Sequence, residues 1–182
     1  MFSNLFGKKA PQENDHIFKD RAYMSTQAKM DACVTLAKED ASVIFIAWFS
    51  ETAKQFKNHF SSGGADENRI VEAKYLTPSH LQSHRPVFVE HYPMHSREEQ
   101  FVEHWKTINI HVYSAMDEPL FKHFGSEKLI PFMKMMGMKE NEVIEHSMVS
   151  KSIINGQKKI EEHVTVEQSA ASQAEWMERN LK

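Results

Sequence analysis

The stretch that most constrains the fold is SVIFIAWF, residues 42–49, which is apolar and β-rich without a break. Because successive side chains of a strand point to opposite faces, this run is apolar on both faces of its sheet. A strand that is buried on both faces requires helices above and below it. Residues 42–49 therefore predict a sheet that lies between two helical layers.

Further helices and strands alternate around this stretch. Helical spacing of apolar residues begins at Ser25, Ser50 and Ser96. Strands that alternate with helices indicate βαβ units with right-handed crossovers and a mainly parallel sheet. We therefore predict an α/β fold, a three-layer α/β/α sandwich with a sheet of about four strands. The other predicted strands occupy residues 69–73, 86–90 and 108–114.

The pattern divides the chain into three parts. The first is a flexible lead-in, although its Phe2, Leu5 and Phe6 could dock as a short apolar plug. The alternating strands and helices form the α/β domain, and a C-terminal helical extension follows it. These parts are predicted at residues 1–16, 17–125 and 126–182.

Two apolar patterns stand out in the helical extension. The methionines of residues 129–136 favour gap-filling core positions over a binding groove, because the flexible thioether side chain fills irregular spaces. Residues 166–181 predict a closing helix, with Thr165 and Gln168 spaced as its capping box, whose apolar stripe packs on the body or on a partner. The residues predicted for an interaction surface are Met133, Met136, Val166, Met177 and Leu181.

Composition and charge argue against several classes of function. A net charge of −3 and a pI near 6.4 give no global attraction to nucleic acid. No stretch reaches the roughly 18 apolar residues of a membrane span, and the N-terminal residues lack the features of a secretion signal. The single Cys33 lies on an apolar helical face, which predicts a buried and unreactive thiol. We therefore expect a cytoplasmic protein that neither binds nucleic acid nor inserts stably into a membrane.

The sequence contains no familiar motif for nucleotide binding or nucleophilic catalysis. The phosphate-binding pattern G-x-x-x-x-G-K-[ST], the dinucleotide pattern G-x-G-x-x-G and the G-x-S-x-G elbow are all absent. Histidines instead cluster between His80 and His111, and zinc would need three or four of them in tetrahedral geometry. Surface and strand-end histidines are the favoured interpretation. The metal candidates are His80, His84, His91 and His95.

The sequence pattern that is most specific to a protein family lies between residues 124 and 161. It includes Phe124-Gly125-Ser126-Glu127, Gly137-Met138-Lys139-Glu140, Ile144-Glu145-His146 and Gln157-Lys158-Lys159. These segments resemble the part of the SecA preprotein translocase ATPase family in which the second motor domain passes into the helical scaffold. The resemblance implies a P-loop NTPase-like, RecA-like domain. It also implies a helical hairpin that packs on this domain through Ile144, Met148, Val149 and Ile153.

The chain departs from that family where ATP would bind. The resemblance implies a Gly-Arg-Gly-Thr-Asp loop between residues 78 and 86 and an arginine-rich loop between residues 105 and 108, and this chain has neither. Phosphoryl transfer needs a cradle for metal and phosphate and a cation that stabilises the transition state. Arg85 and Arg97 are the remaining candidates for phosphate contacts, and each is more simply a surface arginine.

We therefore predict a catalytically inactive relative of the second SecA motor domain, which acts as a protein-interaction or regulatory module without a cofactor. The expected partner is another protein, and an accessory role on a SecA-type ATPase motor stays open. The alternative from another class is a small metal-dependent enzyme that uses the histidines between His80 and His111.

Overall fold

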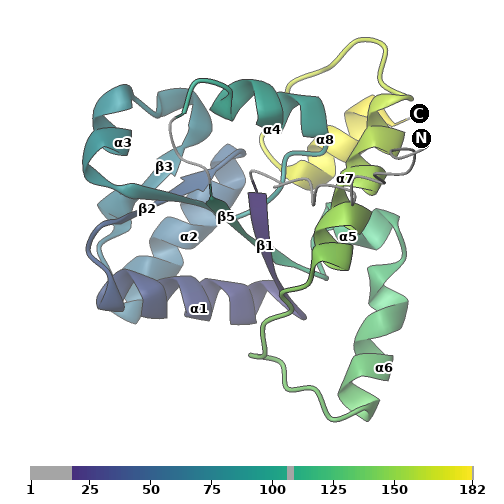
Figure 1. The fold of residues 1–182 in the computed structure, drawn as a ribbon, viewed down its shortest axis with the longest axis horizontal. Coiled ribbons are helices and arrows are strands. Elements are labelled where there is room, and N and C mark those ends of the chain that lie inside the picture. Colours follow the sequence, from purple (N-terminus) through teal and green to yellow (C-terminus); the bar gives the residue numbers. More distant parts are fainter. Residues whose placement is uncertain (1–17, 106–108, 182) are drawn as a thin grey trace, which may run out of the picture.

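A parallel five-stranded sheet forms the centre of the protein (Figure 1). The computed structural model describes residues 18–105 and 109–181. The strand order is β1-β5-β4-β2-β3, and every neighbouring pair is parallel. The predicted α/β fold is confirmed, with one strand more than the sequence indicated. The strands are β1 (Phe18–Tyr23), β2 (Val43–Ala47), β3 (Ile70–Glu72), β4 (Arg85–Phe88) and β5 (Ile110–Ala115).

Helices fill the connections between strands and most of the C-terminal part (Figure 1). None of the described helices is long and apolar enough to cross a bilayer. The α-helices are α1 (Thr26–Glu39), α2 (Ser50–Gly63), α3 (Pro78–Ser83), α4 (His95–Val102), α5 (Pro119–His123), α6 (Leu129–Met135), α7 (Ser147–Glu161) and α8 (Gln173–Asn180). Short 3₁₀ helices are η1 (Glu67–Arg69), η2 (Ala73–Tyr75) and η3 (Ser126–Lys128).

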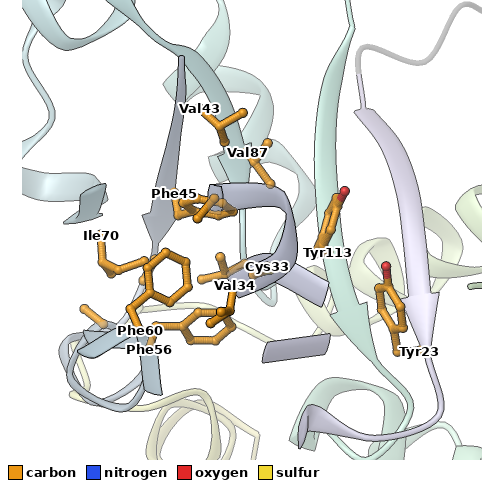
Figure 2. Close-up of a cluster of buried hydrophobic side chains, with 14 of the residues drawn as sticks. Tyr23, Cys33, Val34, Val43, Phe45, Phe56, Phe60, Ile70, Val87 and Tyr113 are labelled. Atoms are coloured by element: carbon orange, nitrogen blue, oxygen red, sulfur yellow. The ribbon is translucent and has the colours of Figure 1, made fainter. Parts of the chain in front are cut away.

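One face of the sheet packs against α1 and α2. Phe45 of β2 and Phe60 of α2 meet edge to face, with ring centroids 5.0 Å apart (Figure 2). Cys33 of α1 lies in the same cluster with no exposed surface, and burial raises the pKa of its thiol to about 12. The predicted burial of Cys33 is therefore confirmed, and the raised pKa of the thiol disfavours the reactive thiolate.

The opposite face of the sheet packs against α4. Ile46, the neighbour of Phe45 on β2, points into this second cluster together with Phe88 of β4. Trp48 stacks on Phe88 with ring centroids 5.1 Å apart. Phe45 and Ile46 are both fully buried, so β2 is covered on both faces, as its unbroken apolar sequence predicted.

A third cluster joins the C-terminal helices to the end of β2. Phe49, which follows β2, packs there against three residues of the C-terminal helices. These are Leu120 of α5, Ile160 of α7 and Trp176 of α8, and all four side chains are fully or almost fully buried. The helical extension therefore covers the carboxyl edge of the sheet. The predicted lead-in, residues 1–16, lies outside the described residues, as does the segment 106–108 in which the second nucleotide-binding loop was expected.

β1 is the strand that the sequence analysis missed. It lies at one edge of the sheet, and its outward-facing Lys19 is exposed while Phe18 and Ala22 are buried. A half-exposed edge strand alternates apolar and polar residues, so it lacks the continuous apolar run that identifies β2. A single antiparallel bridge from Ile144 to Ala22 covers part of its free edge.

The helix starts expected at Ser25 and Ser50 agree with the structure to within one residue, whereas the closing helix is corrected. Ser25 caps α1, because its hydroxyl accepts a hydrogen bond from the Ala28 amide at 3.2 Å. Ser50 is the first residue of α2, and Phe49 rather than a serine occupies its N-cap position. The predicted closing helix at 166–181 is wrong in its first part. Residues 166–172 are not helical, and α8 begins only at Gln173. Its N-cap is Ser172 and not Thr165.

Candidate functional site

An apolar groove lies between the end of β1 and the helices α5, α6 and α7. Its cavity has a volume of about 340 Å³. Ala22 of β1 and Ile144 both line it and are joined by two backbone hydrogen bonds of 2.8 and 3.1 Å. We call this feature the apolar groove. The other lining residues include Met116, Leu120, Phe121, Phe124, Leu129, Met148, Val149 and Ile153.

Helix α6 lines the apolar groove with its first residue, Leu129, and extends away from the sheet, at the lower right of Figure 1. It contains no buried residue, although its sequence, LIPFMKM, is apolar at every position but one. Phe132 is 54% exposed, Met135 77% and Met136, which ends the helix, 72%. We call Leu129, Phe132, Met135 and Met136 the α6 surface. The prediction that these methionines fill a core is therefore wrong.

The predicted hairpin contact is confirmed in part. Ile144 is joined to β1 and Ile153 is buried, so the segment between α6 and α7 does pack on the sheet domain. Met148, however, is 68% exposed at the mouth of the apolar groove. The apolar side of this hairpin therefore divides between internal packing and the wall of the groove.

The predicted interaction residues do not form one surface. Met136 is on the α6 surface and Met133 is half-buried beside it. Val166 is exposed in the loop before α8. Met177 and Leu181 pack against the cluster around Trp176, so they stabilise the extension from within.

A second, polar cavity of about 210 Å³ lies at the carboxyl edge of the sheet. Ligands of open parallel sheets usually bind at this edge. Here the edge carries Glu90 after β4 and Asp117 and Glu118 after β5. Lys29 of α1 is the only lysine or arginine that lines the cavity, and it forms a buried ion pair with Glu118. The described lining is therefore predominantly acidic.

The carboxylates of this edge accept hydrogen bonds from backbone amides of neighbouring segments. Glu90 accepts hydrogen bonds from the amides of Trp48 and Phe49, each at 3.0 Å, and from the Thr52 hydroxyl at 2.8 Å. Glu90, which follows β4, thus binds the start of α2, a segment about 40 positions earlier in the chain. Burial raises the pKa of Glu90 to about 7, against the lowering effect of the Lys29 charge. Burial likewise raises the pKa of Glu118.

His91 is the centre of a buried polar network. Its Nε2 lies 2.6 Å from Asp20 of β1, and its Nδ1 lies 3.0 Å from Glu98 of α4. Burial acts to lower the pKa of His91, but the two carboxylates raise it well above its usual value. Gln157 of α7 donates to Glu98 at 2.9 Å, and Gln173 of α8 donates to the His91 carbonyl at 2.9 Å. The network therefore ties the extension to the sheet.

Of the remaining metal candidates, His80 and His84 lie elsewhere, whereas His95 adjoins this network, with its Nδ1 3.8 Å from Glu98. His80 belongs to the capping box of α3 with Thr77, and His84 ends that helix. His95 begins α4 and contacts Glu99 at 3.3 Å. Within residues 18–105 and 109–181, no group of three or more His, Cys, Asp or Glu side chains is arranged to hold a metal ion.

The two arginines considered for phosphate contacts lie apart and are paired. Arg85 begins β4, at the amino edge of the sheet, and contacts Asp40 at 3.0 Å. Arg97 of α4 contacts Glu167 at 2.6 Å. Neither arginine lines the cavity at the carboxyl edge.

Comparison with known proteins places part of the chain in a family context. No family model matches the chain. Protein translocase subunit SecA of Acidithiobacillus ferrooxidans is 51% identical over 49 residues, which are 27% of this chain and 5% of the relative. The same subunit of Christiangramia forsetii is 49% identical over 51 residues, 28% of this chain and 5% of the relative. That of Cytophaga hutchinsonii is 47% identical over 51 residues, with the same shares.

The matched quarter of the chain is related to SecA.

The match spans about a twentieth of the length of these SecA relatives. The fold agrees with the RecA-like motor domain that the resemblance implied, since it has the parallel sheet, its helical layers and a helical extension. The sequence analysis missed the exposure of Leu129 and Phe132. The available signal was the sequence of α6, which offers almost no polar face to solvent.

Proposed function

We propose that this SecA-related protein is a non-catalytic interaction or regulatory module that binds another protein through the α6 surface and the adjoining apolar groove. The observation that carries the proposal is that α6, an almost entirely apolar helix, has no buried residue. Exposed apolar patches that flank a groove are typical of protein–protein interaction sites.

The α6 surface offers enough apolar area for a moderate affinity. Complete burial of an exposed Phe or Met side chain contributes about 1.5–3 kcal/mol. Because these side chains are already partly buried, full burial of Phe132, Met135 and Met136 would contribute on the order of 3–6 kcal/mol before the cost of association. This range suits a partner that binds reversibly.

The electrostatics of the carboxyl edge support a role without nucleotide hydrolysis. Triphosphate binding requires cations or a cradle of backbone amides. At this edge Lys29 is neutralised by Glu118, and the amides of Trp48 and Phe49 already donate to Glu90. A phosphate group there would also face the negative charge of Asp117.

A SecA-type ATPase is a second, more specific candidate for the partner. The similarity to SecA favours it, because a relative of one motor domain can retain surfaces that fit the other parts of such a motor. In this form of the proposal the protein is an accessory subunit. The histidine-based enzyme is not favoured, because His91 is already enclosed by Asp20 and Glu98.

Capture experiments with surface variants test the proposal. The full chain, Phe132→Ser/Met135→Ser and the control Tyr75→Ser are immobilised and exposed to cytoplasm of the source organism. Tyr75 is 63% exposed on η2, next to the far edge strand β3. We expect a protein that binds the wild type and the control at least about tenfold better than the α6 variant. Equal capture by all three would overturn the proposal, and a SecA ATPase among the α6-dependent proteins would support the accessory role.

A further inference from the structure

We propose that a second copy of this chain packs on the α6 surface and the apolar groove, so that the free protein is a two-fold symmetric dimer through this face. The inference rests on the proposed function, because it names the occupant of the same surface before the partner protein binds. Three observations support a second copy, namely the shape of the face, its exposed apolar area and its lack of unpaired charge.

The face combines a projecting helix with a hollow beside it. Helix α6 extends from the body (Figure 1), and the apolar groove adjoins it. Leu129 belongs to both, because it begins α6 and lines the groove. A two-fold interface is formed by the same patch on both subunits, so the patch must contain its own complement. In such a dimer, α6 of each copy can enter the apolar groove of the other copy.

The exposed apolar area of this face is close to what a stable dimer needs. Six large apolar side chains on it are each between 48% and 77% exposed. A side chain of this size presents about 200 Å² when fully exposed, so the six leave roughly 700 Å² in contact with water on each copy. Two copies would bury about 1,400 Å², within the roughly 1,200–2,000 Å² of stable protein–protein interfaces. The six are Phe124, Leu129, Phe132, Met135, Met136 and Met148.

The charges of this face are compatible with an identical partner. None of the described residues that line the groove is charged, and Lys134 is the single charged residue of α6. The Lys134 ammonium lies 3.5 Å from the Glu140 carboxylate, which offsets its charge. A two-fold axis brings the same patch opposite itself, and like charges across an interface destabilise it. An apolar face avoids this repulsion and has the more apolar character of homodimer interfaces.

Sedimentation analysis of the purified full chain tests the inference. At tens of micromolar, the wild type and the control Tyr75→Ser should have a mass near twice that of one chain. Tyr75 is exposed on η2, beside the opposite edge strand β3. For Phe132→Ser/Met135→Ser we expect a dimer dissociation constant at least about tenfold higher. A monomeric wild type, or a variant that dimerises as the wild type does, would overturn the inference.

Disulfide trapping between two single-site variants tests the packing without removing the apolar face. Met135→Cys mixed with Met148→Cys places one thiol on α6 of one copy and the other beside the groove of the second copy. Met135→Cys mixed with Tyr75→Cys is the matched control, and the native Cys33 is fully buried in each protein. Under mild oxidation with copper phenanthroline, the mixed disulfide of the first pair should form at least about tenfold faster than that of the control. Equal rates, measured by mass spectrometry of the linked peptides, would contradict the inference.

The results separate this inference from the proposed function. A monomeric wild type that captures a protein through Phe132 and Met135 would assign the face to that protein, and only this inference would fall. A dimer that depends on Phe132 and Met135, without capture of any other protein, would support this inference, and only the binding of another protein would fall.

Discussion

Replacement of Lys29 tests whether the carboxyl edge is a structural device. Lys29 is 2% exposed, and its ammonium group donates to the Val89 carbonyl at 2.5 Å and to Glu118. Lys29→Met has a similar volume, but it leaves the buried Glu118 carboxylate without its counter-charge. Removal of one partner of a buried ion pair costs about 3–5 kcal/mol. This is a large part of the roughly 5–15 kcal/mol by which domains are stable.

A double-mutant cycle separates the ion pair from other effects of the substitution. Glu118→Gln alone leaves Lys29 buried and unpaired, so it should also cost several kcal/mol. The double variant Lys29→Met/Glu118→Gln has no unpaired charge and should lose at least about 2 kcal/mol less than the two single losses together. Urea unfolding, followed by tryptophan fluorescence, measures all four proteins. Additive losses, or a Lys29→Met protein within about 1 kcal/mol of the wild type, would refute the structural role.

Two further predictions concern Glu90 and Gly156. The pKa of Glu90 is raised from 4.5 to about 7, so its contribution to stability is complete below pH 4.5 and is lost as the pH rises through 7. Relative to Glu90→Gln, the wild type should lose about 3 kcal/mol between pH 4.5 and pH 8 in urea unfolding, whereas parallel pH profiles would contradict this. A Cβ atom at Gly156 would lie 2.8 Å from the Phe124 ring, which is half-exposed at the groove. Gly156→Ala should therefore displace this ring, which NMR would detect as a loss of contacts between Phe124 and α7. The free energy of unfolding should stay within about 1 kcal/mol of the wild type. A loss of unfolding free energy above about 3 kcal/mol would show that Phe124 cannot move.

The layers of the fold were predictable because the sequence of β2 itself indicates that both faces of this strand are buried. A continuous apolar run such as residues 42–49 can only be buried on both faces, and that requirement implies the helices. β1 gave no such signal. Its burial depends on β5, its parallel neighbour, which is distant in sequence. The contacts at the start of α2 were hidden for the same reason, because the Glu90 carboxylate that binds the Phe49 amide comes from a distant part of the chain.

The candidate site was predictable in composition but not in exposure. The sequence shows that residues 129–136 are predominantly apolar. Such a helix is usually buried, unless no other element of the fold packs against it. That cover is a property of the whole arrangement, in which α6 extends from the body. The histidines illustrate the converse. His91 looked like a possible ligand, yet Asp20, 71 positions away, and Glu98 enclose it in a network that only the folded chain brings together.

Calorimetric titration of magnesium ATP into the purified full chain tests the central claim most directly. The proposal is that this RecA-like fold acts without binding nucleotide, and it predicts no heat beyond dilution up to millimolar ATP. A saturable isotherm with a micromolar dissociation constant, about −8 kcal/mol, would contradict it.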